Sequence, residues 1–141
     1  MRVGEIYWHQ AFYADEANAL LPKYLAILAL PEKDDIVART LTSRYEGTRP
    51  EVPPCFHGLP YPGFFLGVPG PPLTSKSWLD LRHMGDLDSR AVMAKLQSGV
   101  VRLVGAIEPQ KLRAVLECVA NADDTSQRQE RYIRDEISLL P

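Results

Sequence analysis

The stretch that decides the fold is Asp35-Ile36-Val37-Ala38-Arg39-Thr40-Leu41-Thr42-Ser43. Its apolar run predicts a buried strand over residues 36–41. Thr42 and Ser43 place two hydroxyls at the end of this strand, and Arg44 follows them directly. Thr and Ser at a strand end are most often turn formers. Beside a guanidinium, however, the two hydroxyls also form a candidate site for an anion or a phosphodiester.

Segments on both sides of this stretch have the β-branched and aromatic content of strands. The further predicted strands cover residues 3–13, 23–30, 64–68, 77–82 and 100–107. Together with residues 36–41 they make about six short strands. Residues 44–62 contain Pro50, Pro53, Pro54, Pro60 and Pro62, so we predict a long loop there rather than a central strand.

Helical patterns come late in the chain. A short helix is predicted over residues 86–96, followed by a helix that begins at Pro109 with an apolar stripe of Leu112, Val115, Leu116 and Val119. Asp and Ser residues at 123–126 predict the cap of a last helix. Strands that precede helices in the sequence indicate an α+β fold that is mostly β. A chain of 141 residues fits a single domain, which we place over residues 1–141.

Composition limits the possible functions. The formal net charge is -2, which is unlike a non-specific nucleic-acid binder but compatible with a local basic site. No apolar run is long enough for a membrane span, and the first residues are unlike a signal peptide, so we expect a cytoplasmic protein. Cys55 and Cys118 lack a metal-ligand spacing and are expected as free thiols, with Cys118 buried in a helix. A Cys55–His57 nucleophile pair is the minor alternative.

The order of motifs resembles the MazF/PemK-type toxin family, the small ribonucleases of bacterial toxin–antitoxin pairs. The motifs that carry the resemblance are Arg2-Val3-Gly4-Glu5-Ile6, Leu21-Pro22-Lys23-Tyr24, Arg39-Thr40-Leu41-Thr42-Ser43 and Trp78-Leu79-Asp80-Leu81. The match covers residues 2–120, and the helix from about residue 124 onward lies beyond a typical member. Lys23 stands where the family has an Arg, and a Lys lacks the bidentate fork that grips a phosphate.

The resemblance implies a small SH3-like barrel with a short inserted helix and C-terminal helices, assembled as a homodimer. It implies metal-independent cleavage of single-stranded RNA without a cofactor, and a cognate antitoxin as protein partner. Such cleavage needs a base for the 2′-hydroxyl, cations for the phosphorane and an acid for the leaving 5′-oxygen.

Candidate site residues follow from the matched motifs and from residue chemistry. The predicted catalytic residues are Lys23, Thr42, Asp80 and His9. The predicted RNA- or phosphate-binding residues are Ser43, Arg44 and Arg82. Thr42 would donate its hydroxyl to the phosphate, His9 could serve as base, and Arg44 or Arg82 could supply the guanidinium that Lys23 lacks. Ordinary surface or core positions are the competing interpretation for each of them.

Two other functions stay open. The first is a non-catalytic binding module on the same barrel that inhibits or binds a protein partner. The second is a regulatory protein that holds a peptide with the Pro-rich loop. Fold alone does not decide between them.

Overall fold

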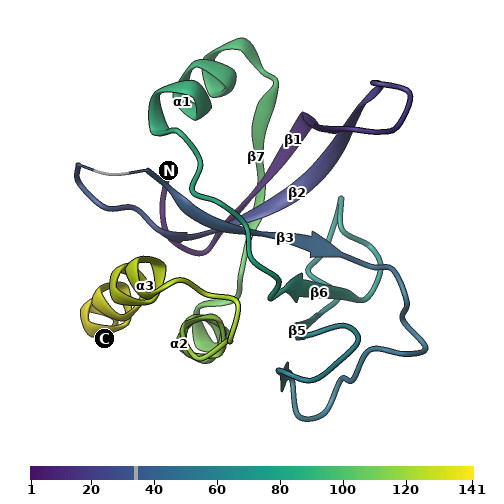
Figure 1. Cartoon of the computed structure of the whole chain (residues 1–141), viewed down its shortest axis with the longest axis vertical. Coiled ribbons are helices and arrows are strands. Elements are labelled where there is room, and N and C mark those ends of the chain that lie inside the picture. The colour runs from purple at the N-terminus through teal and green to yellow at the C-terminus, as the bar shows by residue number, and fades with distance from the viewer. Residues whose placement is uncertain (34) are drawn as a thin grey trace.

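All seven strands belong to one antiparallel sheet. The computed structural model describes residues 1–33 and 35–141, so Asp34 lies outside the described residues. The sheet has the order β4-β5-β6-β3-β2-β1-β7, and three helices pack on it (Figure 1). The strands are β1 (Glu5–Ala14), β2 (Leu20–Ala29), β3 (Val37–Thr42), β4 (Cys55–Phe56), β5 (Gly63–Gly67), β6 (Ser77–Asp80) and β7 (Val101–Ala106). The helices are α1 (Ser89–Ser98), α2 (Pro109–Ala120) and α3 (Gln127–Leu139).

The α+β class, mostly β, is confirmed, as are the inserted helix and the C-terminal helices. The strand count differs from the expected six because β4 lies inside the predicted loop 44–62 and pairs with β5. In the described residues the sheet is open, with β4 and β7 as its edges, so a closed barrel is not seen.

Two cores cover opposite faces of this sheet. The larger core packs α2 and α3 against β-strand residues of one face, and its largest fully buried side chains include Ile6, Leu28, Leu79, Leu116 and Ile133. The smaller core lies under α1 and contains Tyr7, Ile27, Ala38, Val92 and Val101. Ile6 and Tyr7 are neighbours in β1 but belong to different cores, as the alternation of side chains along a strand requires.

The helices begin and end where their local sequences direct. The Asp88 carboxylate accepts the N–H of Ala91 at 2.9 Å, and Gly99 ends α1 with a left-handed φ of 82°. The Ser126 hydroxyl caps α3 by accepting the N–H of Gln129 at 3.1 Å. None of the helices in the described part of the chain is long and apolar enough to cross a membrane.

A buried arginine joins α3 to the sheet. Arg39 of β3 is 1% exposed, and its guanidinium donates to Gln129 Oε1 at 2.8 Å and to Thr125 Oγ1 at 3.4 Å. Two further bonds go to the carbonyls of Ala38 and Met84, at 2.9 Å and 3.3 Å. Burial lowers the pKa of Arg39, and nearby Asp carboxylates oppose that shift. Through Gln129, Arg39 thus gives α3 a buried polar link to β3.

Candidate cation and hydroxyl site

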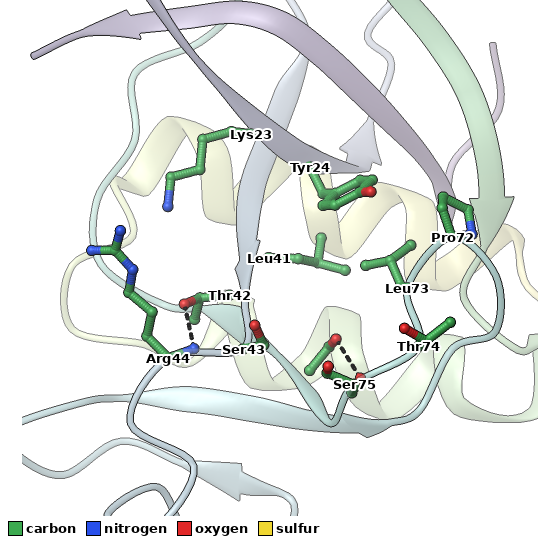
Figure 2. A pocket seen from close by; sticks show the side chains of 11 residues that line it. Lys23, Tyr24, Leu41, Thr42, Ser43, Arg44, Pro72, Leu73, Thr74 and Ser75 are labelled. Atoms are coloured by element: carbon green, nitrogen blue, oxygen red, sulfur yellow. Dashed lines mark hydrogen bonds between the residues drawn. The ribbon is translucent and has the colours of Figure 1, made fainter.

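A cavity of about 240 Å³ opens where β3 ends, against the first half of β2 and beside the connection between β5 and β6. Four of the predicted site residues line it: Lys23, Thr42, Ser43 and Arg44. The rest of the wall comes from Tyr24, Leu41, Pro72, Leu73, Thr74, Ser75 and Ser77. Figure 2 shows the ends of the Lys23 and Arg44 side chains directed into the same space, with the Thr42 hydroxyl on that side.

Strand register explains why these residues meet. Tyr24 pairs with Leu41, so Lys23 and Thr42 are the next positions along the two antiparallel strands. Side chains opposite each other in such a pair share one face of the sheet. The smaller core lies on the same face. Ile27 of β2 and Ala38 of β3 belong to that core, and each lies an even number of positions from Lys23 or Thr42 in its own strand.

Thr42 both ends the strand and offers a donor. Its Oγ1 accepts the backbone N–H of Arg44 at 3.1 Å (Figure 2). This local bond is the turn-forming role typical of Thr at a strand end. A hydroxyl has one donor and two acceptor sites, so the Thr42 O–H is still available to a ligand.

The cavity is electropositive. Burial lowers the pKa of Lys23 most, and the charges of Arg44, Arg82 and Arg49 lower it further, while Asp80 opposes them. In the described residues neither Lys23 nor Arg44 forms an ion pair with a carboxylate; Lys23 Nζ instead lies 5.8 Å from the ring centre of Tyr13. Within the described residues, an anion would therefore find two positive charges that no carboxylate holds in an ion pair.

Asp80 and Arg82 are engaged with each other. Both carboxylate oxygens of Asp80 accept from the Arg82 guanidinium, at 2.6 Å to Nη2 and 3.1 Å to Nε. Asp80 is 7% exposed, whereas the Arg82 side chain is 65% exposed. The pair lines a neighbouring cavity with Phe12 and Thr40, outside the Lys23 cavity. Asp80 thus orients Arg82, and its oxygens are occupied.

His9 is close in register but lies outside the cavity. It pairs with Lys23 across β1 and β2, yet it is 4% exposed. Its Nδ1 accepts the N–H of Ala11 at 3.2 Å, and the ring of Phe12 packs edge-on at 5.4 Å. Burial, and then the charge of Lys95, lower the pKa of His9, which favours the neutral ring.

Arg49 was not among the predicted site residues. This residue is 6% exposed, its Nε donates to the Arg44 carbonyl at 2.9 Å, and its buried Nη1 has no hydrogen-bond partner among the described residues. Its guanidinium lies 4.9 Å from the ring centre of Tyr61. Burial lowers its pKa, and the Asp80 carboxylate opposes that shift. The available signal was a cation five residues after Arg44, at the start of the Pro-rich loop.

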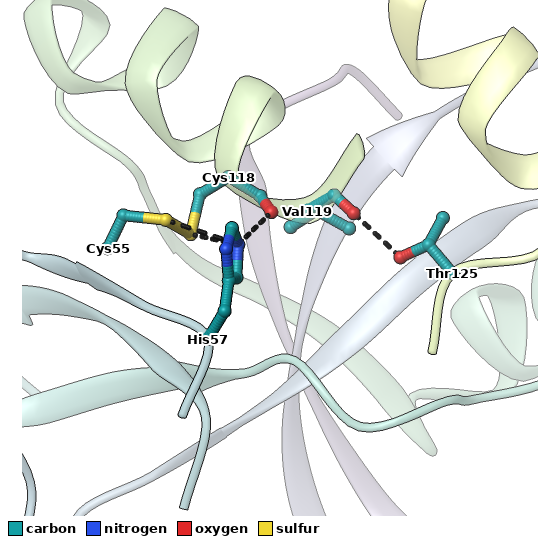
Figure 3. The surroundings of a disulfide bond; sticks show 5 residues. All are labelled: Cys55, His57, Cys118, Val119 and Thr125. Atoms are coloured by element: carbon teal, nitrogen blue, oxygen red, sulfur yellow. Dashed lines mark hydrogen bonds between the residues drawn. A yellow bond between two sulfur atoms is a disulfide. The ribbon is translucent and has the colours of Figure 1, made fainter. Parts of the chain in front are cut away.

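The Pro-rich loop is anchored at two points beyond Arg49. The Trp78 indole, which is 1% exposed, donates to the Pro50 carbonyl at 2.9 Å. Cys55 of β4 forms a disulfide with Cys118 of α2 (Figure 3). The expectation of two free thiols is therefore wrong, because the fold brings together two cysteines that are 63 residues apart.

His57 lies against the disulfide. Its Nε2 is 3.4 Å from Cys55 Sγ, 3.6 Å from Cys118 Sγ and 2.9 Å from the Cys118 carbonyl oxygen (Figure 3). In the described residues these three side chains form the one group with metal-ligand atoms close enough to share an ion. Both sulfurs are bonded to each other, so Cys55 offers neither a thiolate ligand nor the nucleophile of a Cys–His pair.

In comparisons with known proteins, no family model, no curated protein and no solved structure matches this chain.

Proposed function

We propose that this protein binds single-stranded RNA at the Lys23 cavity and cleaves it, as the toxin of a type II toxin–antitoxin pair. The observation that carries the proposal is the convergence of Lys23, Arg44 and the Thr42 hydroxyl on one side of β3, in a cavity that Ser43 also lines and whose described lining residues include no carboxylate (Figure 2). Cations with adjacent hydroxyl donors match the charge and the oxygens of a phosphodiester.

In the proposed reaction, the 2′-hydroxyl loses its proton to a solvent water, the 2′-oxygen attacks the phosphorus and the bond from phosphorus to the 5′-oxygen breaks, giving a cyclic phosphate and, once protonated, a new 5′-hydroxyl. Arg44 and Lys23 would stabilise the charge that develops on the non-bridging oxygens, with the Thr42 and Ser43 hydroxyls as donors. Lys23 has a lowered pKa, which suits it to transfer a proton to the leaving oxygen. Arg82, held by Asp80, would contact a neighbouring phosphate.

The second candidate is RNA or protein binding without chemistry. It is favoured by the state of the two predicted bases, since Asp80 is bonded to Arg82 through both oxygens and His9 is buried outside the cavity. A free base beside Lys23 is thus not evident among the described residues. The cognate antitoxin, the homodimer and a cytoplasmic site of action are parts of the toxin proposal, whereas the SH3-like barrel is proposed under both candidates.

The deciding experiment is incubation of purified protein with single-stranded RNA in EDTA, with mass spectrometry of the product ends. Cyclic phosphate ends that disappear with Lys23→Ala, Arg44→Ala and Thr42→Val would support cleavage. Arg113→Ala, which changes an exposed Arg on α2, is the matched control. Intact RNA that is nevertheless bound would favour the second candidate, and no binding to any RNA would refute both RNA functions.

The disulfide also allows a test of the cellular compartment in which the protein acts. Disulfides are rare in cytosolic proteins, whereas RNA cleavage by a toxin would take place in the cytosol. Trapping of free thiols in freshly lysed cells, before and after reduction, would determine the state of Cys55 and Cys118 where the protein acts.

A further inference from the structure

Three side chains of the Pro-rich loop are stacked beside the Lys23 cavity. The Arg49 guanidinium lies 4.9 Å from the ring centre of Tyr61. The Tyr61 ring in turn lies 4.5 Å from that of Tyr45, at an interplanar angle of 8°. Tyr45 ends the stack and is 53% exposed. In the described part of the chain, no second ring or cation stacks on Tyr45.

The backbone holds Tyr45 in a conformation that is uncommon for a residue with a side chain. Its φ is 60°, in the left-handed region. The Tyr45 carbonyl accepts the N–H groups of Thr48 and Arg49, at 2.9 Å and 3.0 Å, and the Thr48 hydroxyl at 3.0 Å. Three hydrogen bonds therefore hold the Tyr45 backbone, and the stack on Tyr61 orients its exposed ring, before any ligand arrives. Preorganisation of this kind reduces the entropy cost of binding.

The position of the stack connects it to the cations. Tyr45 directly follows Arg44, which lines the cavity, and Arg49 donates to the Arg44 carbonyl. Arg82 is close enough to Tyr45 and Tyr61 to interact with them electrostatically. Hydrogen bonding to Asp80 raises the pKa of Arg82 most, and the two tyrosines add to that rise. An exposed ring thus stands within a group of three arginines, Arg44, Arg49 and Arg82.

We propose that the exposed face of Tyr45 binds an unpaired base of the nucleic acid whose phosphate lies on Lys23, Thr42 and Arg44. This inference rests on the proposed RNA function and specifies its substrate as a strand with accessible bases. Every base has a π-face, so stacking at Tyr45 is independent of sequence, and a duplex, whose bases are already stacked, would be excluded.

The test uses fluorescence anisotropy with a short 2′-O-methyl oligonucleotide, which lacks the attacking hydroxyl and cannot be cleaved. The matched probe is an abasic oligonucleotide of the same length and charge. Tyr45→Asn removes the ring but suits the left-handed backbone, because Asn tolerates positive φ. Tyr45→Phe keeps the ring. Circular dichroism of each variant establishes that the fold is retained.

Base stacking on an aromatic side chain typically changes affinity by about 5-fold to 150-fold. We expect Tyr45→Asn to weaken binding of the base-containing probe by a factor in this range and to leave the abasic probe unchanged, while Tyr45→Phe binds both probes as the wild type does. If Tyr45→Asn and the wild type discriminate equally between the two probes, the stacking inference is wrong while RNA binding stands. Equal affinity for duplex and single strand would also overturn it. If the wild type binds neither probe, the proposed function itself fails.

Discussion

Removal of the Cys55–Cys118 disulfide should lower the free energy of unfolding by an amount that the chain length predicts. The cross-link joins residues 63 positions apart, and the enclosed segment includes β5, β6, α1 and β7. Closing a loop of this length in the denatured chain corresponds to about 4 kcal/mol by the chain-entropy relation. The double variant Cys55→Ser/Cys118→Ser should therefore be about 4 kcal/mol less stable than the oxidised protein.

Urea unfolding followed by far-ultraviolet circular dichroism measures this difference. Oxidised wild type, wild type in reductant and the double variant are compared under the same conditions. The reduced wild type separates the loss of the cross-link from the change of side chain, so it should match the double variant. A difference below about 1 kcal/mol between oxidised and reduced protein would refute the loop-entropy reasoning.

The same experiment bears on the proposed site of action. Domains are typically stable by about 5–15 kcal/mol, so a loss of about 4 kcal/mol should leave the reduced protein folded at 25 °C. In a Trp8→Phe background, the fluorescence of Trp78 reports on the Pro-rich loop in that state, because its indole donates to the Pro50 carbonyl. Unfolding on reduction alone would contradict action in a reducing cytosol.

Three further predictions concern single residues. A Cβ on Gly63 would lie 3.1 Å from the Leu79 carbonyl oxygen and 3.4 Å from Arg49 Nη1, so Gly63→Ala should cost about 1–3 kcal/mol in urea unfolding and weaken RNA binding. Burial, together with Glu5, raises the pKa of Tyr7 from 10.0 to about 12, so its contribution to stability is complete below pH 10 and is lost as the pH rises through 12. Tyr7→Phe should flatten that loss in unfolding curves at alkaline pH, and an unchanged slope would contradict the assignment. The lowered pKa of His9 means that the wild type loses stability as the pH falls below 6.5, and His9→Gln should lose less between pH 7.5 and pH 5 in the same assay.

Local patterns predicted most of the fold. The Asp88 and Ser126 caps, and Pro109 at the start of α2, act within one helical turn, so the sequence around each helix start contains the signal. The strands were predicted from their β-branched and aromatic residues, and most predicted strand ends lie within one or two residues of the observed ends. β4 was missed because a two-residue strand has no periodicity of its own and exists through its pairing with β5.

The candidate site likewise contains residues that were predicted from the sequence and residues that were not. Lys23 and Thr42 were named together from the resemblance, and the pairing of the consecutive strands β2 and β3 places them side by side. Arg49 could not be predicted from the sequence, since its position depends on the path of a loop and on burial beside Tyr61. The disulfide is a long-range contact between an edge strand and a helix, and the spacing of two cysteines in a sequence does not reveal it.

The buried Arg39 changes how the end of the chain should be regarded. Its side-chain acceptors, Thr125 and Gln129, both lie in the segment that the resemblance treats as an extension. Cutting the chain before residue 125 would remove both side-chain acceptors of Arg39 and uncover the part of the larger core that Ile133 covers, so the last helix is part of the folded unit rather than an appendage. A protein partner that pulled α3 away would break the same contacts. Any partner that recognises α3 must therefore do so on its outer face, with the helix still in place.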